Sequence, residues 1–208
     1  MWSFVVIGAK FCLGIKMIRK ILIANRGEIV CRIADTAKAM GIETVAVYSD
    51  IDKGSLHVNS CDQAVHIGGS QAAESYLNIA SIITAAIDTD SDAIHPGYGF
   101  LSENASFAEA CLKAGIIFIG PSVSNINDMG SKAVSKIILE KAKIPVVPGY
   151  HGCEQSLDYL KARAEEIGYP VLIKASAGGG GRGMRLVESP ENIDESLALA
   201  QNEAKAAF

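Results

Sequence analysis

The sequence has few of the features that mark metal-binding, nucleic-acid-binding or membrane-spanning proteins. Its five cysteines form no Cys-x-x-Cys pair and have no histidine at metal-ligand spacing, so neither a zinc site nor a disulfide framework is indicated. Lysine and arginine number 19 against 23 acidic residues, for a formal net charge of −4 without a basic run, which argues against a nucleic-acid partner. No apolar stretch approaches the roughly 20 residues that cross a bilayer, so we expect no membrane segment.

The first residues, 1–17, show no clear pattern of helix or strand. They contain no arginine and no small-residue cleavage site, so they resemble neither a secretory signal nor an arginine-rich organellar signal. We treat them as an unassigned leader and favour Met17 as the functional start, because chain ends tolerate such additions.

From residue 18 to about residue 130, apolar strands alternate with amphipathic helices. Helices between successive strands require right-handed crossovers, which give an open, mainly parallel sheet with helices on both faces. The stretch 18–130 therefore predicts one α/β domain, with ligands at the carboxyl ends of the strands. The expected strands are Lys20–Ala24, Thr44–Tyr48, Gln63–Ile67, Asp92–His95 and Ile116–Ile119, and the expected helices are Gly27–Met40, Asn78–Ile87 and Ala105–Ala114.

Residues 131–208 are expected to begin a second domain. Two strands are too few for a stable sheet, so we expect the chain to stop inside this domain. The elements expected after residue 122 are helices Val123–Met129, Lys132–Lys143 and Ser156–Ile167, strands Pro170–Ala175 and Met184–Val187, and a last helix opened by Ser189 and Pro190.

The sharpest local feature is a glycine-rich loop that follows Lys174. Five of the residues from Gly178 to Gly183 are glycine. Each glycine costs roughly 0.5 to 1 kcal/mol of local order against alanine, and a simple hairpin turn needs only one or two. The excess is explained if bare backbone N–H groups close over phosphates while Lys174 supplies a positive charge. The alternative is a flexible structural turn.

Two common nucleotide-binding motifs are missing. The sequence has no Gly-x-x-x-x-Gly-Lys-Ser/Thr, and the first strand is followed by Asn25-Arg26-Gly27-Glu28 rather than by Gly-x-Gly-x-x-Gly. P-loop and dinucleotide-binding folds are therefore disfavoured. A two-stranded, glycine-looped lid of the ATP-grasp type remains.

Five motifs, in order along the chain, are similar to those of biotin carboxylases. They are Ile23–Ile29 (IANRGEI), His95–Asn104 (HPGYGFLSEN), Phe118–Pro121 (FIGP), Met129–Lys132 (MGSK) and Lys174–Arg185 (KASAGGGGRGMR). The resemblance covers residues 18–208. Within that family, the segment Gly149–Gly152 (GYHG), followed by Gln155 and Ser156, looks most like the biotin-containing subunits of 3-methylcrotonyl-CoA carboxylases.

The resemblance implies a ligase in which ATP activates bicarbonate to carboxyphosphate and the released CO2 carboxylates a biotin ring nitrogen. It implies that Lys132 and Lys174 contact ATP and that Gly180 and Gly181 lie over the phosphates. Met184 is implied to lie near the nucleotide. For Lys132, a solvated position on a helix is the alternative.

The loop His95–Asn104 follows a buried strand and combines glycines with polar side chains, as a loop facing a cleft would. We take His95, Tyr98 and Glu103 as possible cleft-lining residues. The alternative is a tight structural loop in which Ser102 caps the following helix.

Some other polar residues carry weaker signals. Arg26 and Glu28 are candidates for the rim of the site, although an ion pair at the start of a helix is the more ordinary interpretation. His57, His66 and His151 have no partner at a telling spacing, and we assign them no function.

The resemblance also implies which residues are missing. In the family, the metal carboxylates, the bicarbonate base, the biotin-site arginine and the residues around the adenine lie beyond the lid. We therefore expect no catalytic residue and no metal ligand in this fragment, and no activity from it alone. The implied cofactors and substrates are ATP, Mg2+, bicarbonate and biotin.

The implied partners are a biotin carboxyl carrier domain, a carboxyltransferase subunit and a second copy in a homodimer. The implied location is cytoplasmic, or the mitochondrial matrix in a eukaryote. Two other interpretations stay open: an ATP-grasp ligase of the carbamoyl-phosphate or purine-pathway type, and a folded dimerisation module without activity.

Overall fold

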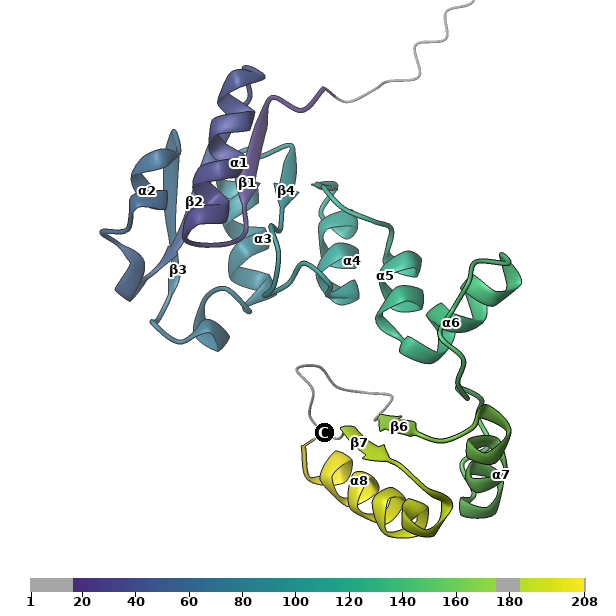
Figure 1. The fold of residues 1–208 in the computed structure, drawn as a ribbon. Helices are drawn as coiled ribbons and strands as arrows, with labels where there is room; N and C mark the ends of the chain where they lie inside the picture. Colours follow the sequence, from purple (N-terminus) through teal and green to yellow (C-terminus); the bar gives the residue numbers. More distant parts are fainter. Residues whose placement is uncertain (1–16, 175–183, 208) are drawn as a thin grey trace, which may run out of the picture. The chain divides into compact units, whose positions relative to one another are not determined.

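The computed structural model describes residues 17–174 and 184–207 of the chain (Figure 1). Its backbone contacts define two compact units, with the division between Ser122 and Val123. Each unit has its own hydrophobic core. Each unit therefore positions its own set of candidate site residues.

The first unit contains a five-stranded sheet in which all neighbouring strands are parallel. The strand order is β3-β2-β1-β4-β5, so the chain builds outward on one side of β1 and then returns to build on the other side. This confirms the predicted α/β class and the mainly parallel sheet. The strands are β1 (Lys20–Ile23), β2 (Glu43–Ser49), β3 (Gln63–Gly68), β4 (Ala93–His95) and β5 (Ile117–Phe118).

Helices cover both faces of this sheet (Figure 1). Successive strand residues point to opposite faces. Ile21 and Ile23 therefore pack with the buried side of α1, whereas Leu22 and Ile94 pack with α3 and α4. Strands buried on both faces are apolar throughout, which is why the sequence shows them as continuous apolar runs. The helices are α1 (Glu28–Ala39), α2 (Leu56–Ser60), α3 (Ile79–Asp88) and α4 (Ala105–Lys113).

Three short elements are not predicted by the sequence. The 3-10 turn η1 (Asp50–Asp52) and helix α2 follow β2, and the 3-10 turn η2 (Ala72–Glu74) precedes α3. Segments of three to five residues are too short to show a helical apolar period. Tertiary packing stabilises such short segments instead. In α2, for example, His57 is buried, and its Nε2 lies 3.3 Å from the carbonyl oxygen of Val47 on β2.

The second unit contains an antiparallel hairpin and four helices in its described part. Its core joins Ala164, Val187, Ile193 and Leu197, so α7 and α8 cover one face of the hairpin. The elements are α5 (Val123–Gly130), α6 (Lys132–Lys141), α7 (Leu157–Ile167), β6 (Val171–Lys174), β7 (Met184–Val187), the 3-10 turn η3 (Pro190–Asn192) and α8 (Ile193–Ala207).

Candidate functional site

Lys174 and Met184 lie directly opposite each other at one end of the β6–β7 hairpin. Leu172 and Leu186 form the next pair on the same side of the hairpin. Directly opposite residues of an antiparallel pair point to the same face, and residues two apart on one strand share that face. These four side chains therefore form one surface, which we call the outer face of the hairpin.

The outer face is open to solvent in the second unit. Leu172 is 56% exposed and Leu186 is 61% exposed, whereas Val187, on the opposite face, is 1% exposed. The asymmetry arises because α7 and α8 cover the inner face only. An exposed apolar surface that ends in a lysine can accept a flat apolar ring and an anionic group of the same ligand.

Gly180 and Gly181, the residues expected to cover phosphates, lie outside the described residues. They belong to the segment 175–183, which joins Lys174 to Met184. Their expected role stays a prediction. The structure does bring together the two predicted residues that flank this segment.

Lys132, the other predicted ATP contact, begins α6 in the second unit. The N-cap of that helix is Ser131, whose hydroxyl accepts a hydrogen bond from the backbone N–H of Val134 at 3.3 Å. Lys132 is half-buried rather than freely solvated. Its predicted contact with ATP stays untested by this geometry.

In the first unit, the loops after β1 and β4 leave neighbouring strands at the same edge of the sheet. This is the point where the strand order reverses, at which sheets of this kind bind ligands. Asn25 fills the space between the two loops: it is 3% exposed, and its Nδ2 donates to the carbonyl oxygens of Pro96 and Tyr98, each at 2.8 Å.

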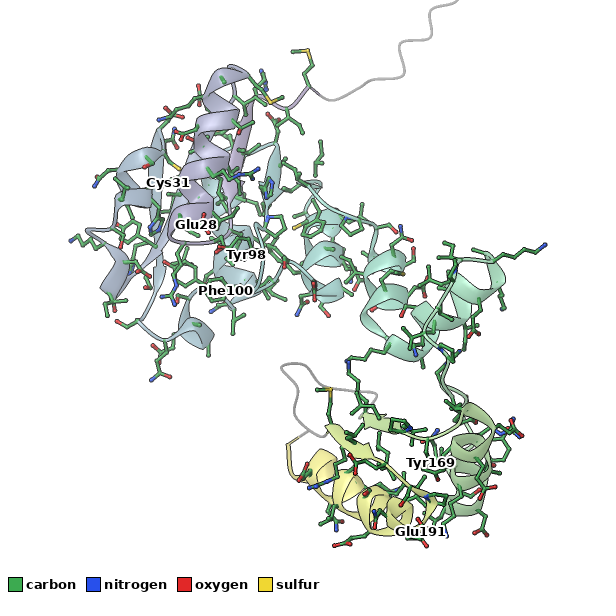
Figure 2. All side chains as sticks on the ribbon, viewed as in Figure 1. Glu28, Cys31, Tyr98, Phe100, Tyr169 and Glu191 are labelled. Atoms are coloured by element: carbon green, nitrogen blue, oxygen red, sulfur yellow. The ribbon has the colours of Figure 1, made fainter. Side chains whose placement is uncertain are left out.

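Two of the possible cleft-lining residues, His95 and Tyr98, lie in the second of these loops. The Nδ1 of His95 accepts a hydrogen bond from the backbone N–H of Gly97 at 3.0 Å, and burial lowers the pKa of His95, which favours the neutral ring. The Tyr98 hydroxyl donates to Glu28 (Figure 2), and this bond raises the pKa of Tyr98. The structure thus joins two candidates that are 70 residues apart in sequence.

Arg26 does not form an ion pair with Glu28 at the start of α1. It pairs instead with Asp52, with 3.3 Å between Nη1 and Oδ2. Its guanidinium also lies 5.3 Å from the ring centroid of Tyr76 and 5.5 Å from that of Phe100. The expectation fails because Glu28 is engaged by Tyr98, while η1 brings Asp52 to the carboxyl edge of the sheet.

Asp52 is the centre of a hydrogen-bond cluster at this edge. Its Oδ2 accepts from the hydroxyls of Tyr76 and Ser49, each at 2.8 Å. Burial acts to raise the pKa of Asp52, but these bonds and the one from Arg26 outweigh it and lower the pKa. Burial, together with the bond to Asp52, raises the pKa of Tyr76 to about 12. The carboxylate is therefore charged and the phenol neutral at physiological pH.

The alternative role for Ser102 as a helix cap is wrong. The N-cap of α4 is Asn104, whose side chain accepts from the backbone N–H of Phe107 at 2.9 Å. Glu103 is exposed just before this cap. Its proposed position in a cleft stays untested.

The sequence interpretation missed four residues that the geometry singles out. Asn25 stands inside a recognised motif, which could have drawn attention to it. Asp52 and Tyr76 carry no local signal, because only the fold brings them together. Leu172 lies two residues before Lys174, so strand periodicity alone could have placed it on the same face.

The described residues hold no metal cluster and no membrane helix. In the ranges 17–174 and 184–207, no three His, Cys, Asp or Glu side chains gather in a way that could hold a metal ion. No helix within those ranges is both long and apolar enough to cross a membrane.

Two family models match the chain. The model described as "Biotin carboxylase, N-terminal domain" matches residues 17–126, and the model described as "Carbamoyl-phosphate synthase L chain, ATP binding domain" matches residues 131–208. The first covers more than half of the chain.

Among curated proteins, the chain is 56% identical over 191 residues to the mitochondrial methylcrotonoyl-CoA carboxylase subunit alpha of Oryza sativa subsp. japonica. This match covers 92% of the chain but 26% of that relative. The chain is 48% identical to biotin carboxylase 1 of Bacillus subtilis, covering 92% of the chain and 43% of the relative. The chain thus spans less than half the length of each of these relatives.

Among solved structures, the chain resembles a biotin carboxylase from Campylobacter jejuni in complex with βγ-ATP. The TM-score is 0.86 at 48% identity, covering 92% of this chain and 43% of that one. It also resembles a dimeric biotin carboxylase domain of the Hydrogenobacter thermophilus 2-oxoglutarate carboxylase, which binds MgADP, ADP and bicarbonate. There the TM-score is 0.83 at 47% identity, with coverage of 93% and 42%.

Proposed function

The chain belongs to the biotin carboxylase family, and from this we propose that it supplies the N-terminal and part of the nucleotide-binding region of an ATP- and bicarbonate-dependent biotin carboxylase. We assign residues 18–130 to the N-terminal α/β domain and residues 131–208 to the start of the ATP-grasp domain. The acceptor of the whole enzyme is an acyl-CoA, of the 3-methylcrotonyl type. The identities of 53 to 57% to methylcrotonoyl-CoA carboxylase alpha subunits, against 50% to a propionyl-CoA carboxylase alpha chain, support that choice.

The observation that carries the nucleotide assignment is the outer face of the hairpin. Lys174 and Met184 are paired at its end, and Leu172 extends the face with apolar surface. A purine ring has two apolar faces and a triphosphate carries several negative charges, so one ligand satisfies both parts of this surface. The outer face therefore receives ATP, with the base against Leu172 and Met184 and the phosphates towards Lys174.

The charge of Lys174 contributes most to this binding. At an effective dielectric constant of about 20, a lysine about 4 Å from a phosphate oxygen gains about 4 kcal/mol, and solvent exposure reduces the gain. Lys132 adds a second cation, and the backbone N–H groups of Gly180 and Gly181 add hydrogen bonds.

Magnesium enters this region as the ion carried on the nucleotide phosphates. The described residues do not offer a cluster of carboxylates that fits a bound metal ion. In the reaction, ATP transfers its terminal phosphoryl group to bicarbonate, which gives ADP and carboxyphosphate. Carboxyphosphate breaks down to phosphate and CO2, and a biotin ring nitrogen loses its proton and bonds to the CO2. The residues in this chain serve to bind and orient the nucleotide.

His95, Tyr98 and Glu103 belong to the cleft at the carboxyl edge of the first unit's sheet. A biotin carboxyl carrier domain delivers biotin, a carboxyltransferase subunit uses the carboxybiotin, and two copies of the biotin carboxylase form a dimer. The protein acts in the cytoplasm, or in the mitochondrial matrix of a eukaryote; the plant, slime-mould and rodent relatives are described as mitochondrial.

The test is ADP release by the protein encoded by the complete reading frame, supplied with MgATP, bicarbonate and free biotin. We expect release that requires both bicarbonate and biotin. A folded protein that binds ATP but shows no biotin-dependent release contradicts the reaction assigned here. Release that depends on ammonia or glutamine instead of biotin would point to a ligase of the carbamoyl-phosphate type.

A further inference from the structure

Tyr98 combines high exposure with an unusual degree of restraint. The residue is 60% exposed, yet it is held at both ends: its carbonyl oxygen accepts a hydrogen bond from Asn25, and its hydroxyl donates to Glu28 (Figure 2). Both partners come from the segment that follows β1. One short segment therefore fixes the backbone and the ring of the same residue.

Asn25 holds the backbone of Tyr98 through its side-chain amide, a role that neither aspartate nor alanine can fill. Its two amide hydrogens go to two carbonyl oxygens, and its Oδ1 accepts from the backbone N–H of Arg26 at 2.9 Å. Aspartate has the same shape but would place a carboxylate oxygen, which cannot donate, against the two carbonyl oxygens that Nδ2 serves. Alanine would leave the buried carbonyl group of Pro96 and the part-buried carbonyl group of Tyr98 without this donor.

The loop itself is built to rest on Asn25. Gly97 has a φ of 65°, and a Cβ added there would lie 2.8 Å from the Nδ2 of Asn25. Any side chain at this position would therefore be strained and would push the loop away from the amide. The close approach of Gly97 to Asn25 and the two hydrogen bonds from Asn25 together fix the position of the Tyr98 backbone.

Holding an exposed tyrosine in one orientation costs side-chain entropy and gains little stability at a solvated surface. The cost is recovered when the ring is already in position for a ligand that binds there, since less order must then be created on binding. The location agrees, because the loop lies where the strand order of the sheet reverses.

We propose that Asn25 and Glu28 are positioning residues that hold Tyr98 in place to touch a substrate of the biotin carboxylase reaction. Asn25 acts on the backbone of Tyr98 and Glu28 acts on its hydroxyl. Neither residue contacts the substrate itself. This inference rests on the proposed function for its catalytic part, while its structural part can be tested without activity.

The structural test is a titration of Tyr98 in the 208-residue chain by NMR of 13C-labelled tyrosine, with the signal assigned by Tyr98→Phe. In the unsubstituted chain we expect Tyr98 to ionise above the ordinary tyrosine value of 10.0, because its hydroxyl donates to a carboxylate. Asn25→Ala should lower the pKa of Tyr98 towards that value even though Glu28 is still present, and Glu28→Ala should do the same directly. An unchanged pKa in folded Asn25→Ala overturns the role of Asn25.

The catalytic test is a double-mutant cycle in the complete protein, read as kcat/KM for biotin-dependent ADP release. We expect Asn25→Ala and Tyr98→Phe each to lower kcat/KM, Asn25→Ala by about tenfold or more, and the double variant to be no worse than the poorer single variant. Losses that simply multiply overturn the proposal, because Asn25 would then act independently of Tyr98.

Two further variants separate positioning from general stability. Asn78→Ala removes another asparagine with a structural hydrogen bond, the cap of α3, and should leave kcat/KM unchanged. Asn25→Asp should recover activity relative to the unsubstituted protein as the pH falls, because a protonated carboxyl regains one donor. A flat ratio across pH contradicts the proposal. If the unsubstituted protein shows no biotin-dependent activity, the proposed function fails, and the NMR titration still decides the positioning role.

Discussion

Lys174 on β6 stands directly opposite Met184 on β7, so a cation and a thioether share the exposed face of one hairpin. The helices α7 and α8 occupy the other face. This arrangement separates two tasks within a few residues of strand. The inner face maintains the fold of the second unit, and the outer face is available for a ligand.

Leu172→Asp should weaken MgATP binding by the complete protein without unfolding it. The side chain is 56% exposed, so little packing is lost, but a carboxylate on the outer face would repel phosphate and remove apolar contact. Loss of an apolar contact worth about 1.5 kcal/mol or more corresponds to roughly tenfold weaker binding. Calorimetric titration with MgATP measures the effect.

Leu199→Asp is the matched control for this substitution. Leu199 is also partly exposed, at 41%, but it lies on α8 away from the outer face. Binding by this variant should equal that of the unsubstituted protein. If Leu172→Asp also binds MgATP as tightly as the unsubstituted protein, the outer face is not part of the nucleotide site.

For the hairpin, the sequence predicted the strands but not which face the helices cover. The sequence predicted strands Pro170–Ala175 and Met184–Val187, with a glycine-rich loop between them. The sequence of β6, Val171–Lys174, is apolar at three successive positions, so periodicity could not say which face α7 and α8 cover. The covered face is the one where Val171 and Ile173 are partly buried against the helices, and only the tertiary structure shows this.

Phe107→Ala should destabilise the first unit by about 3 to 5 kcal/mol, because it leaves a cavity in the core. Phe107 is fully buried on α4, and its ring meets that of Phe118 edge to face at a centroid distance of 5.9 Å. Hydrogen exchange of the β1 and β4 amides measures the loss of stability within this unit. Leu112→Ala, on the same helix at 73% exposure, should change it by less than about 0.5 kcal/mol. Similar exchange in both variants contradicts the assigned core.

The carboxyl edge of the first sheet was predicted as a location but not as a set of contacts. Alternating strands and helices sufficed to place the loops after β1 and β4 at one rim. The contact between Arg26 and Asp52 depends on the short turn η1, and that of Asn25 with Tyr98 spans 73 residues. Local patterns carry no information on such pairings, which is why the expected ion pair of Arg26 was wrong. The Ser102 cap was wrong for a local reason: Asn104, two residues nearer to α4, occupies the N-cap position instead.

His57 should make the first unit less stable in mild acid. Burial lowers the pKa of His57 below its ordinary value of 6.5, although a hydrogen bond to Val47 opposes the shift. The unfolded chain therefore binds a proton more readily than the folded one. The stability contributed by neutral His57 is complete above pH 6.5 and falls as the pH drops below this value towards the folded pKa.

His57→Gln should weaken this pH dependence, measured by urea unfolding across the range from about pH 7 to about pH 5. Asp52 and Arg26 act on His57 with opposite signs and are kept unchanged in the comparison. His66→Gln replaces a half-exposed histidine paired with Asp50 and serves as the control. If His57→Gln keeps the full pH dependence, another group is responsible for it.

The most direct measurement is calorimetric binding of MgATP to the complete protein and to its Lys174→Gln variant, with Lys141→Gln on α6 as an exposed control. We expect binding by the unsubstituted protein and the control alike, and binding at least about tenfold weaker, or about 1.4 kcal/mol, for Lys174→Gln. A well-folded complete protein that does not bind MgATP, or a Lys174→Gln variant that binds it as tightly as the original, would contradict the assignment of this hairpin to the nucleotide.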